Sequence, residues 1–156
     1  MAHLVQGRME IDIGIRSPPK KLYNVFSSKP QDISDASPDN VHGTKLHEGD
    51  WGKVGSVIHW DYVHDGQPKT AKERIDALDD ENNKATFSVI EGDLLNLYKT
   101  FILIVQATAK EGGTGTTVHW TIEYEKVSEE TPEPYSLLEF AVKVTRDIDA
   151  NLTSGA

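Results

Sequence analysis

The amino-acid sequence predicts an α+β fold in which one curved antiparallel sheet grips a single long helix near the C-terminus. Three observations predict it. Most of the chain consists of short segments in which apolar and polar residues alternate, as in strands with one solvated face. Turns rich in Gly, Asn and Asp separate these segments, which favours consecutive hairpins. The last apolar segment repeats with helical spacing instead, so one long helix remains to cover one face of the sheet.

The N-terminal part is expected to form one strand and two short helices. The first strand has one apolar parity, made of Val5, Met9, Ile11, Ile13 and Ile15. Ser17 is expected to cap a helix that Pro18 and Pro19 open. Its apolar face contains Leu22, Val25 and Phe26. Residues 29–40 are polar and contain two prolines, which predicts a short second helical piece followed by a loop.

Six further strands are expected between residues 41 and 126. The dipeptide Asp65-Gly66 gives a strong hairpin signal. Residues 98–109 are apolar on both parities, so periodicity alone leaves their orientation open. The inward sets of the other strands are Ile58, Trp60 and Tyr62; Ala71, Ile75 and Ala77, with Glu73 on the same face; Ala85, Phe87 and Val89; and Val118, Trp120, Ile122 and Tyr124.

The last segment predicts an amphipathic helix of roughly 18 residues, near the upper end of ordinary globular lengths. Its apolar stripe consists of Leu137, Ala141, Val144, Ile148 and Leu152, and Leu138 and Val142 widen it.

Composition limits the function classes. The 156 residues are most simply one domain, 1–156, with 37% hydrophobic and 26% charged residues, as in globular proteins. The absence of cysteine excludes disulfides, thiolate metal sites and a cysteine nucleophile. A formal charge of −9 argues against nucleic acid or an anionic membrane as the main partner. With no signal-like start and no membrane-length apolar run, we expect a cytoplasmic protein without integral membrane association.

Six segments, in this order, resemble the plant major latex protein family of the Bet v 1 (pathogenesis-related class 10) superfamily. They are "LHEGDWGKVGSV" (46–57), "WDYVHDG" (60–66), "AKERIDALD" (71–79), "FSVIEGDL" (87–94), "VHWTIEYEK" (118–126) and "VTRDIDANL" (144–152). The resemblance covers nearly the whole chain. It implies a START-like helix-grip fold, with two short helices at one end and an internal cavity. It also implies an acidic cytosolic protein, associated with defence and stress, that binds a hydrophobic small molecule such as a sterol, fatty acid, hormone or phenolic compound.

Within this fold, the inward-facing side chains become candidates for ligand binding, whereas alternation alone favours a plain hydrophobic core. The candidates are Met9, Ile11, Phe26, Trp60, Tyr62, Glu73, Ile75, Phe87, Val89, Phe101, Leu103, Trp120, Tyr124, Leu138, Ala141 and Val142. An inward Glu73 needs a partner, a water or a ligand. Lys99 is one possible partner, unless a bulge turns it outward. The alternative is that Glu73 and Arg74 are both surface charges near a frayed strand end.

Several other interpretations stay open. The segment "EGDWGKVG" is either a rigid turn or a phosphate loop. The turn is favoured, because a phosphate loop runs into a helix and a strand follows here. The histidines do not predict a metal site or a nucleophile–base pair, and no cofactor is expected. Superfamily relatives imply an alternative enzyme of specialised metabolism that catalyses condensation or isomerisation, with Glu73, Tyr62, Tyr124 and Lys99 as acid–base candidates. A promiscuous storage protein is a third possibility. The outward parity of Ile102 and Ile104 is compatible with a monomer or a weak homodimer.

Overall fold

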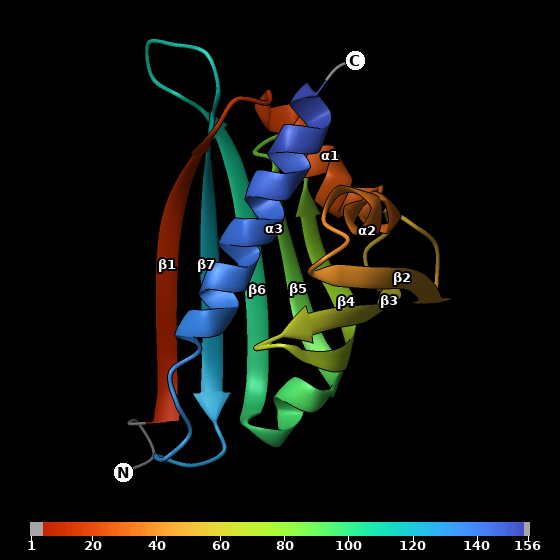
Figure 1. Cartoon of the computed structure of the whole chain (residues 1–156), viewed down its shortest axis with the longest axis vertical. Helices are drawn as coiled ribbons and strands as arrows, with labels where there is room; N and C mark the ends of the chain where they lie inside the picture. The colour runs from red at the N-terminus through yellow and green to blue at the C-terminus, as the bar shows by residue number, and fades with distance from the viewer. Residues whose placement is uncertain (1–4, 155–156) are drawn as a thin grey trace.

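The computed structural model describes residues 5–154. Within this range the chain forms one sheet with helices inside its curve (Figure 1). In chain order the elements are β1 (Gln6–Ile15), α1 (Pro19–Ser27), η2 (Pro30–Asp32), α2 (Ile33–Ala36), β2 (Val41–Glu48), β3 (Val57–His64), β4 (Gln67–Asp79), β5 (Lys84–Gly92), η3 (Asp93–Asn96), β6 (Tyr98–Ala109), β7 (Thr116–Lys126) and α3 (Tyr135–Thr153).

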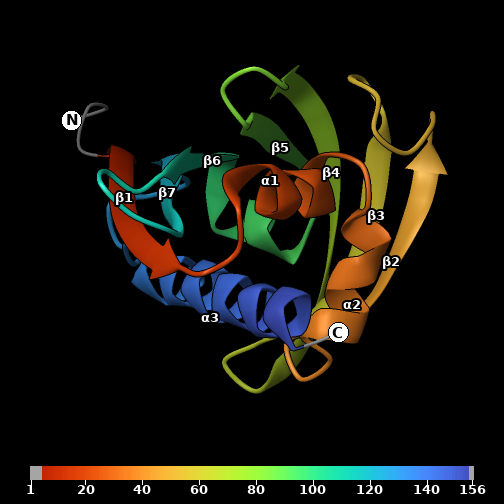
Figure 2. The same cartoon turned by 90° about the horizontal axis from the view of Figure 1, so that it is seen from above.

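The sheet has seven antiparallel strands in the order β1-β7-β6-β5-β4-β3-β2. Consecutive hairpins link β2 to β7, and the first strand pairs with the last and forms one edge of the sheet. Seen from above, the sheet bends around α3, while α1 and α2 close one side of the space between them (Figure 2). The predicted helix-grip fold is therefore confirmed, including the two short helices and the long C-terminal one.

Alternation fixes which side chains face inward, and register shifts interrupt it; two of them change the expected orientation of a side chain. On β4 the register shifts between Ile75 and Ala77, so Ala77 is exposed and Leu78 packs against the core in its place. The prediction of an inward Ala77 was wrong for this reason. On β6 the shift between Tyr98 and Thr100 turns Lys99 outward.

The start of α1 differs from the predicted capping. The helix begins at Pro19 after Pro18, and no side chain caps it. The Ser17 hydroxyl instead donates a hydrogen bond to Asp149 of α3. Because proline fixes φ and needs no amide partner in the first turn, the helix starts without the predicted serine cap, and Ser17 joins α1 to α3.

The C-terminal half of α3 is fastened on two sides by carboxylates. Asp149 accepts hydrogen bonds from the backbone N–H of Ser17 at 2.9 Å and of Arg16 at 3.2 Å, at the end of β1. Asp147 accepts one from the Ser37 hydroxyl, 2.7 Å away, just after α2. Burial opposes ionisation of Asp149, but the hydrogen bonds from Ser17 and Arg16 outweigh it and lower the pKa of Asp149. Among the described residues, no helix is both long and apolar enough to cross a membrane.

Replacing Asp149 with alanine is expected to lower the free energy of unfolding by about 1–3 kcal/mol, because the donors of Ser17 and Arg16 lose their acceptor. Urea denaturation followed by circular dichroism measures the change. Glu139→Ala, at an exposed position of the same helix, is the matched control. Equal stability of the two variants would contradict the anchoring role of Asp149.

Candidate ligand-binding cavity

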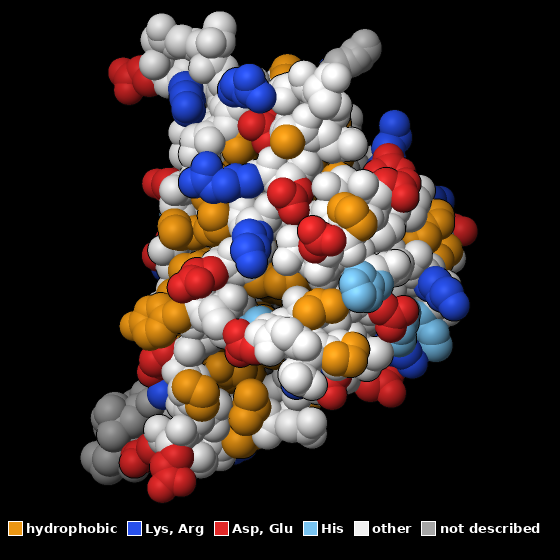
Figure 3. Space-filling model, in the orientation of Figure 1, with side chains coloured by type: hydrophobic (Ala, Val, Ile, Leu, Met, Phe, Trp, Pro, Cys, Tyr) orange, Lys and Arg blue, Asp and Glu red, His pale blue; other side chains and the backbone are white. Residues whose placement is uncertain are grey.

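A cavity lies between the concave face of the sheet and α3. The space open to the centre of a water molecule is about 110 Å³, several times what a single water needs. In the space-filling view, hydrophobic side chains are visible between α3 and the β2–β3 side of the molecule (Figure 3). The lining residues are Phe26, Ile33, Val41, Trp60, Tyr62, Ala71, Glu73, Phe87, Leu94, Phe101, Leu103, Trp120, Leu137, Phe140, Ala141 and Val144.

Aromatic side chains connect the helices to the sheet at the cavity wall. Trp120 of β7 packs edge-to-face on Phe26 of α1, with the ring centres 5.3 Å apart, and its indole N–H donates to Thr145 Oγ1 at 2.8 Å. Tyr62 of β3 packs in the same way on Phe140 of α3, with a separation of 5.6 Å. These bulky rings fill the margins between α3 and the sheet, and the central space stays open.

Glu73 is the carboxylate of the cavity wall. It lies on β4, diagonally across from Trp60 on β3, because Trp60 pairs with Ala71 and Ile58 pairs with Glu73. The part of its side chain that remains accessible faces the cavity, and desolvation raises the pKa of Glu73 to about 7. The nearby Trp60 indole opposes this increase, although its buried Nε1 makes no hydrogen bond of normal geometry. Strand parity suggested an inward Glu73 and left a surface position at a frayed strand end as the alternative; the structure has Glu73 at the cavity wall.

Tyr62 is the second polar group of the wall. Burial raises its pKa well above the ordinary tyrosine value, and the negative charges of Glu73 and Asp93 add to the increase. Its hydroxyl therefore stays protonated across the physiological range and remains a hydrogen-bond donor.

The pair between Glu73 and Lys99, which the sequence left open, does not form. The bulge on β6 turns Lys99 to the outer face, where its side chain is 61% exposed and its amine lies 3.5 Å from Glu125. Glu73 thus faces the cavity without a cationic side chain in the lining.

Nine of the sixteen candidate ligand-binding residues line the cavity, and seven lie elsewhere. The cavity-lining candidates are Phe26, Trp60, Tyr62, Glu73, Phe87, Phe101, Leu103, Trp120 and Ala141. The others are Met9, Ile11, Ile75, Val89, Tyr124, Leu138 and Val142, and their positions have three physical reasons.

The first reason is the edge of the sheet. Met9 and Ile11 lie on β1, which is an edge strand, so Met9 is only partly buried and Ile11 is 37% exposed. The second is close packing, because Ile75 and Val89 are buried in the core outside the cavity. Tyr124 is also buried, but its hydroxyl is bound to Glu133, before α3.

The third reason is the rotation of α3 around its axis. Leu138 and Val142 share a helical face with Thr145, which bonds to Trp120, and with Asp149, which bonds to the end of β1. That face packs toward β7 and β1. The neighbouring face, with Leu137, Ala141 and Val144, is the one that lines the cavity.

Four lining residues were not predicted as inward-facing: Ile33, Val41, Leu94 and Phe140. Helical spacing gives a signal for Phe140, since it lies three and four residues from Leu137 and Val144. The other three come from α2, the start of β2 and η3, which are too short or too irregular to show a period.

The glycine-rich segment at 48–56 is a closed turn. Its glycines Gly49, Gly52 and Gly55 have φ values of +85°, +79° and +93°, which favour glycine. Four of its backbone N–H groups are used inside the protein: Asp50 donates to Ser56 Oγ, Lys53 to the carbonyl of Asp50, Gly55 to that of Ile75, and Ser56 to that of Lys53. Since these donors already have acceptors, the geometry favours the rigid turn over the phosphate loop.

The histidines do not gather into a metal centre. Within residues 5–154, no three or more His, Asp or Glu side chains are placed to hold a metal ion. His59 contacts Asp61 at 3.2 Å, and His64 contacts Ser136 at 2.8 Å. Neither histidine contact brings together the set of ligands that a metal site needs.

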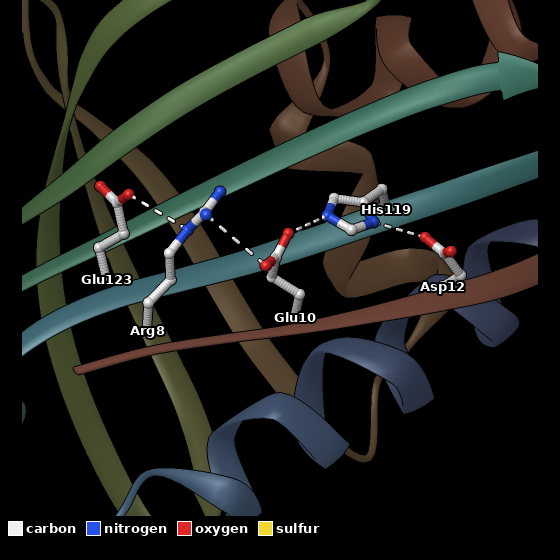
Figure 4. Close-up of polar contacts among 5 residues, drawn as sticks. All are labelled: Arg8, Glu10, Asp12, His119 and Glu123. Atoms are coloured by element: carbon white, nitrogen blue, oxygen red, sulfur yellow. Dashed lines mark hydrogen bonds and ion pairs between the residues drawn. The ribbon is translucent and has the colours of Figure 1, made fainter.

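His119 belongs to a charged network on the outer face of the sheet (Figure 4). Its ring nitrogens lie 2.5 Å from Asp12 and 2.7 Å from Glu10, both on β1. Arg8 extends the network, with ion-pair distances of 3.6 Å to Glu10 and 3.4 Å to Glu123. The hydrogen bond to Asp12 is the main cause that raises the pKa of His119. The network holds β1 to β7 and lies on the opposite side of the sheet from the cavity.

His119→Gln is expected to lose stability mainly at low pH. Because the folded-state pKa of His119 is raised, its contribution is complete below the unfolded value of about 6.5 and disappears as pH rises through the folded value. Thermal unfolding of both proteins between about pH 5.5 and pH 8.5 measures the difference. His47→Gln, at an exposed position of β2, is the control. A stability difference that does not change with pH would contradict this role of His119.

The fold and the cavity define a helix-grip protein with an apolar interior. The chain belongs to the pathogenesis-related protein Bet v 1 family, whose model matches residues 4–155, and the predicted resemblance to major latex proteins is confirmed. It is 51% identical over 146 residues to MLP-like protein 28 of Arabidopsis thaliana, covering 94% of this chain but only 44% of that protein. It is 49% identical to MLP-like protein 31 of the same plant, covering 94% and 85%.

Solved structures agree with this family. Ginseng major latex-like protein 151 from Panax ginseng matches with a TM-score of 0.90 and 38% identity, over 94% of this chain and 97% of that one. A norcoclaurine synthase point mutant from Thalictrum matches with a TM-score of 0.71 and 17% identity, over 96% and 98%. The second match shows a shared fold only.

Proposed function

We propose that this protein is an intracellular plant binding or carrier protein that holds one hydrophobic small molecule beneath α3. Sterols, fatty acids, hormones and phenolic compounds are the ligand classes to test, in a role associated with defence or stress. The proposal treats residues 1–156 as one domain that works in the cytoplasm as a monomer or weak homodimer. It involves no cofactor, nucleic acid or integral membrane association.

The observation that carries the proposal is the largely apolar cavity between α3 and the sheet. An unfilled cavity forfeits packing energy in the free protein, and a ligand that fills it removes apolar surface from water, worth about 25 cal/mol per Å². Any molecule that binds only the folded state also stabilises that state. The arrangement therefore favours binding of a mainly apolar body.

Filling the cavity is expected to abolish binding while the fold is kept. Ala141→Phe places a ring in the cavity, whereas Ala150→Phe makes the same change at an exposed position of α3. Each protein is incubated with a small-molecule extract of plant tissue and examined by native mass spectrometry. We expect one stoichiometric bound mass on the wild type and Ala150→Phe, reduced at least about tenfold on Ala141→Phe.

Circular dichroism and thermal unfolding show whether Ala141→Phe is folded. Equal binding by a folded Ala141→Phe would contradict a ligand site in the cavity. Weak association of many unrelated compounds with the wild type, none of them preferred, would instead favour promiscuous storage.

An enzyme of specialised metabolism is the second candidate, because Glu73 has a pKa near neutrality inside an apolar cavity. Tyr62 shares that wall, whereas Lys99 lies on the outer face and Tyr124 is bound to Glu133. Only two of the four acid–base candidates thus remain at the cavity. This arrangement favours binding over a condensation or isomerisation reaction.

The enzyme alternative predicts turnover that depends on Glu73. With amine and carbonyl compounds supplied together, product formation followed by mass spectrometry should fall by about 100-fold in Glu73→Gln if general acid–base catalysis operates. Glu91→Gln, an exposed change next to β4, is the control. Binding without any product in the wild type would rule the alternative out for these substrates.

A further inference from the structure

We infer that the cavity prefers an amphiphile that places a positively charged nitrogen against Glu73, and that it discriminates against carboxylate ligands. The inference rests on the proposed binding function and names the chemical class of the ligand. Three features of the wall support it: a carboxyl without a cationic partner, an indole N–H that makes no hydrogen bond of normal geometry, and the absence of cations in the described lining.

The two basic residues next to Glu73 on β4, and Lys99 of β6, are paired elsewhere. Strand alternation directs the two neighbours of Glu73 on β4 to the other face of the sheet. The pairs are Lys72 with Glu91 at 3.1 Å, Arg74 with Asp76 at 2.7 Å, and Lys99 with Glu125 at 3.5 Å. The protein therefore supplies Glu73 with no positive counter-charge, and a ligand has to bring one.

The charge around Glu73 is negative or neutral on every side. From β3 the titratable group that faces it is the Tyr62 hydroxyl, and Asp93 at the start of η3 adds a negative charge near that hydroxyl. The lining residues from α1, α2, β2, β5, β6, β7 and α3 carry no titratable side chain. A cation enters a favourable potential here, whereas a carboxylate meets a like charge in a medium that screens it poorly.

Trp60 gives the site a second polar element. Its Nε1 is buried without a hydrogen-bond partner and lies beside Glu73 on the same face of the sheet. Such an unpaired donor costs free energy in the empty cavity. When Glu73 is ionised, its carboxylate can accept a hydrogen bond from the indole N–H on one side and contact the ligand cation on the other. Binding of one cation therefore gives both Glu73 and Trp60 a partner.

Protonation distinguishes the empty state from the bound state. Without a counter-charge, burial favours the neutral acid, with a pKa of about 7. A bound ammonium, whose own pKa is near 10, favours the ionised acid and displaces its proton to solvent. Binding of an amine near neutral pH should therefore release a proton, whereas an alcohol of the same shape should not.

Three probes with one apolar body test this: phenylbutylamine, phenylbutanol and phenylbutyrate. Isothermal titration calorimetry at about pH 8 should show the amine binding at least about tenfold more tightly than the carboxylate. Amine affinity should fall by roughly tenfold at about pH 5.5, where Glu73 is protonated. Near pH 6.5, titrations in buffers of different ionisation enthalpy should show proton release for the amine alone.

Glu73→Gln should remove the pH dependence and the proton release of amine binding. Glu91→Gln, the same chemical change on the outer face, should behave as the wild type. If Glu73→Gln does not fold, proton release by the wild type still decides the question. Preference for phenylbutyrate, or amine binding without proton release, overturns the inference. In that case, binding of phenylbutanol would still uphold the proposed function. Failure of all three probes to bind overturns both.

Discussion

The interior of this protein depends on how α3 is attached. Asp149 holds the helix to the end of β1 and Asp147 holds it to the segment after α2, both with hydrogen bonds at the side of the sheet. Trp120 adds a third attachment through Thr145. Because these polar contacts belong to the C-terminal half, the helix stays in place without complete packing beneath its N-terminal half. If apolar packing alone held the helix, each Å³ of cavity beneath it would lower the free energy of unfolding by about 24 cal/mol. The cavity is therefore compatible with a stable fold.

The attachment of α3 over the cavity also determines the protonation of Glu73. In water a glutamate ionises near pH 4.5, and desolvation by burial raises the pKa of Glu73 to about 7. If α3 moved away and water entered, the carboxyl would regain its solvation and ionise more readily. Cavity closure and protonation of Glu73 are thus thermodynamically linked in the empty protein. A ligand that supplies a positive charge reverses this link, since it favours the closed state and the ionised carboxylate together.

Sequence patterns predicted most of the fold, because alternation and helical spacing report directly which face of an element is buried. They placed Trp60, Tyr62 and Glu73 on one wall, as the structure does. They failed at Ala77, where one extra residue changed the register, and they left Lys99 open, since a bulge leaves no trace in apolar periodicity. They also could not separate packed core from cavity wall. Ile75 and Glu73 share a strand face, and only the position of α3 and its side chains decides which of them meets empty space.

The two faces of the sheet respond to pH in different windows. For Glu73 in the empty cavity, the folded-state pKa lies above the unfolded one, so folding stability falls as pH rises from about 4.5 to about 7. For His119 on the outer face, stability is lost as pH rises above about 6.5, toward and through its raised pKa. A cationic ligand would cancel the first decline, because it binds the ionised carboxylate, and would leave the second unchanged, because the His119 network lies across the sheet. The pH profile of stability therefore distinguishes occupancy of the cavity by a cation from any general stabilisation of the fold.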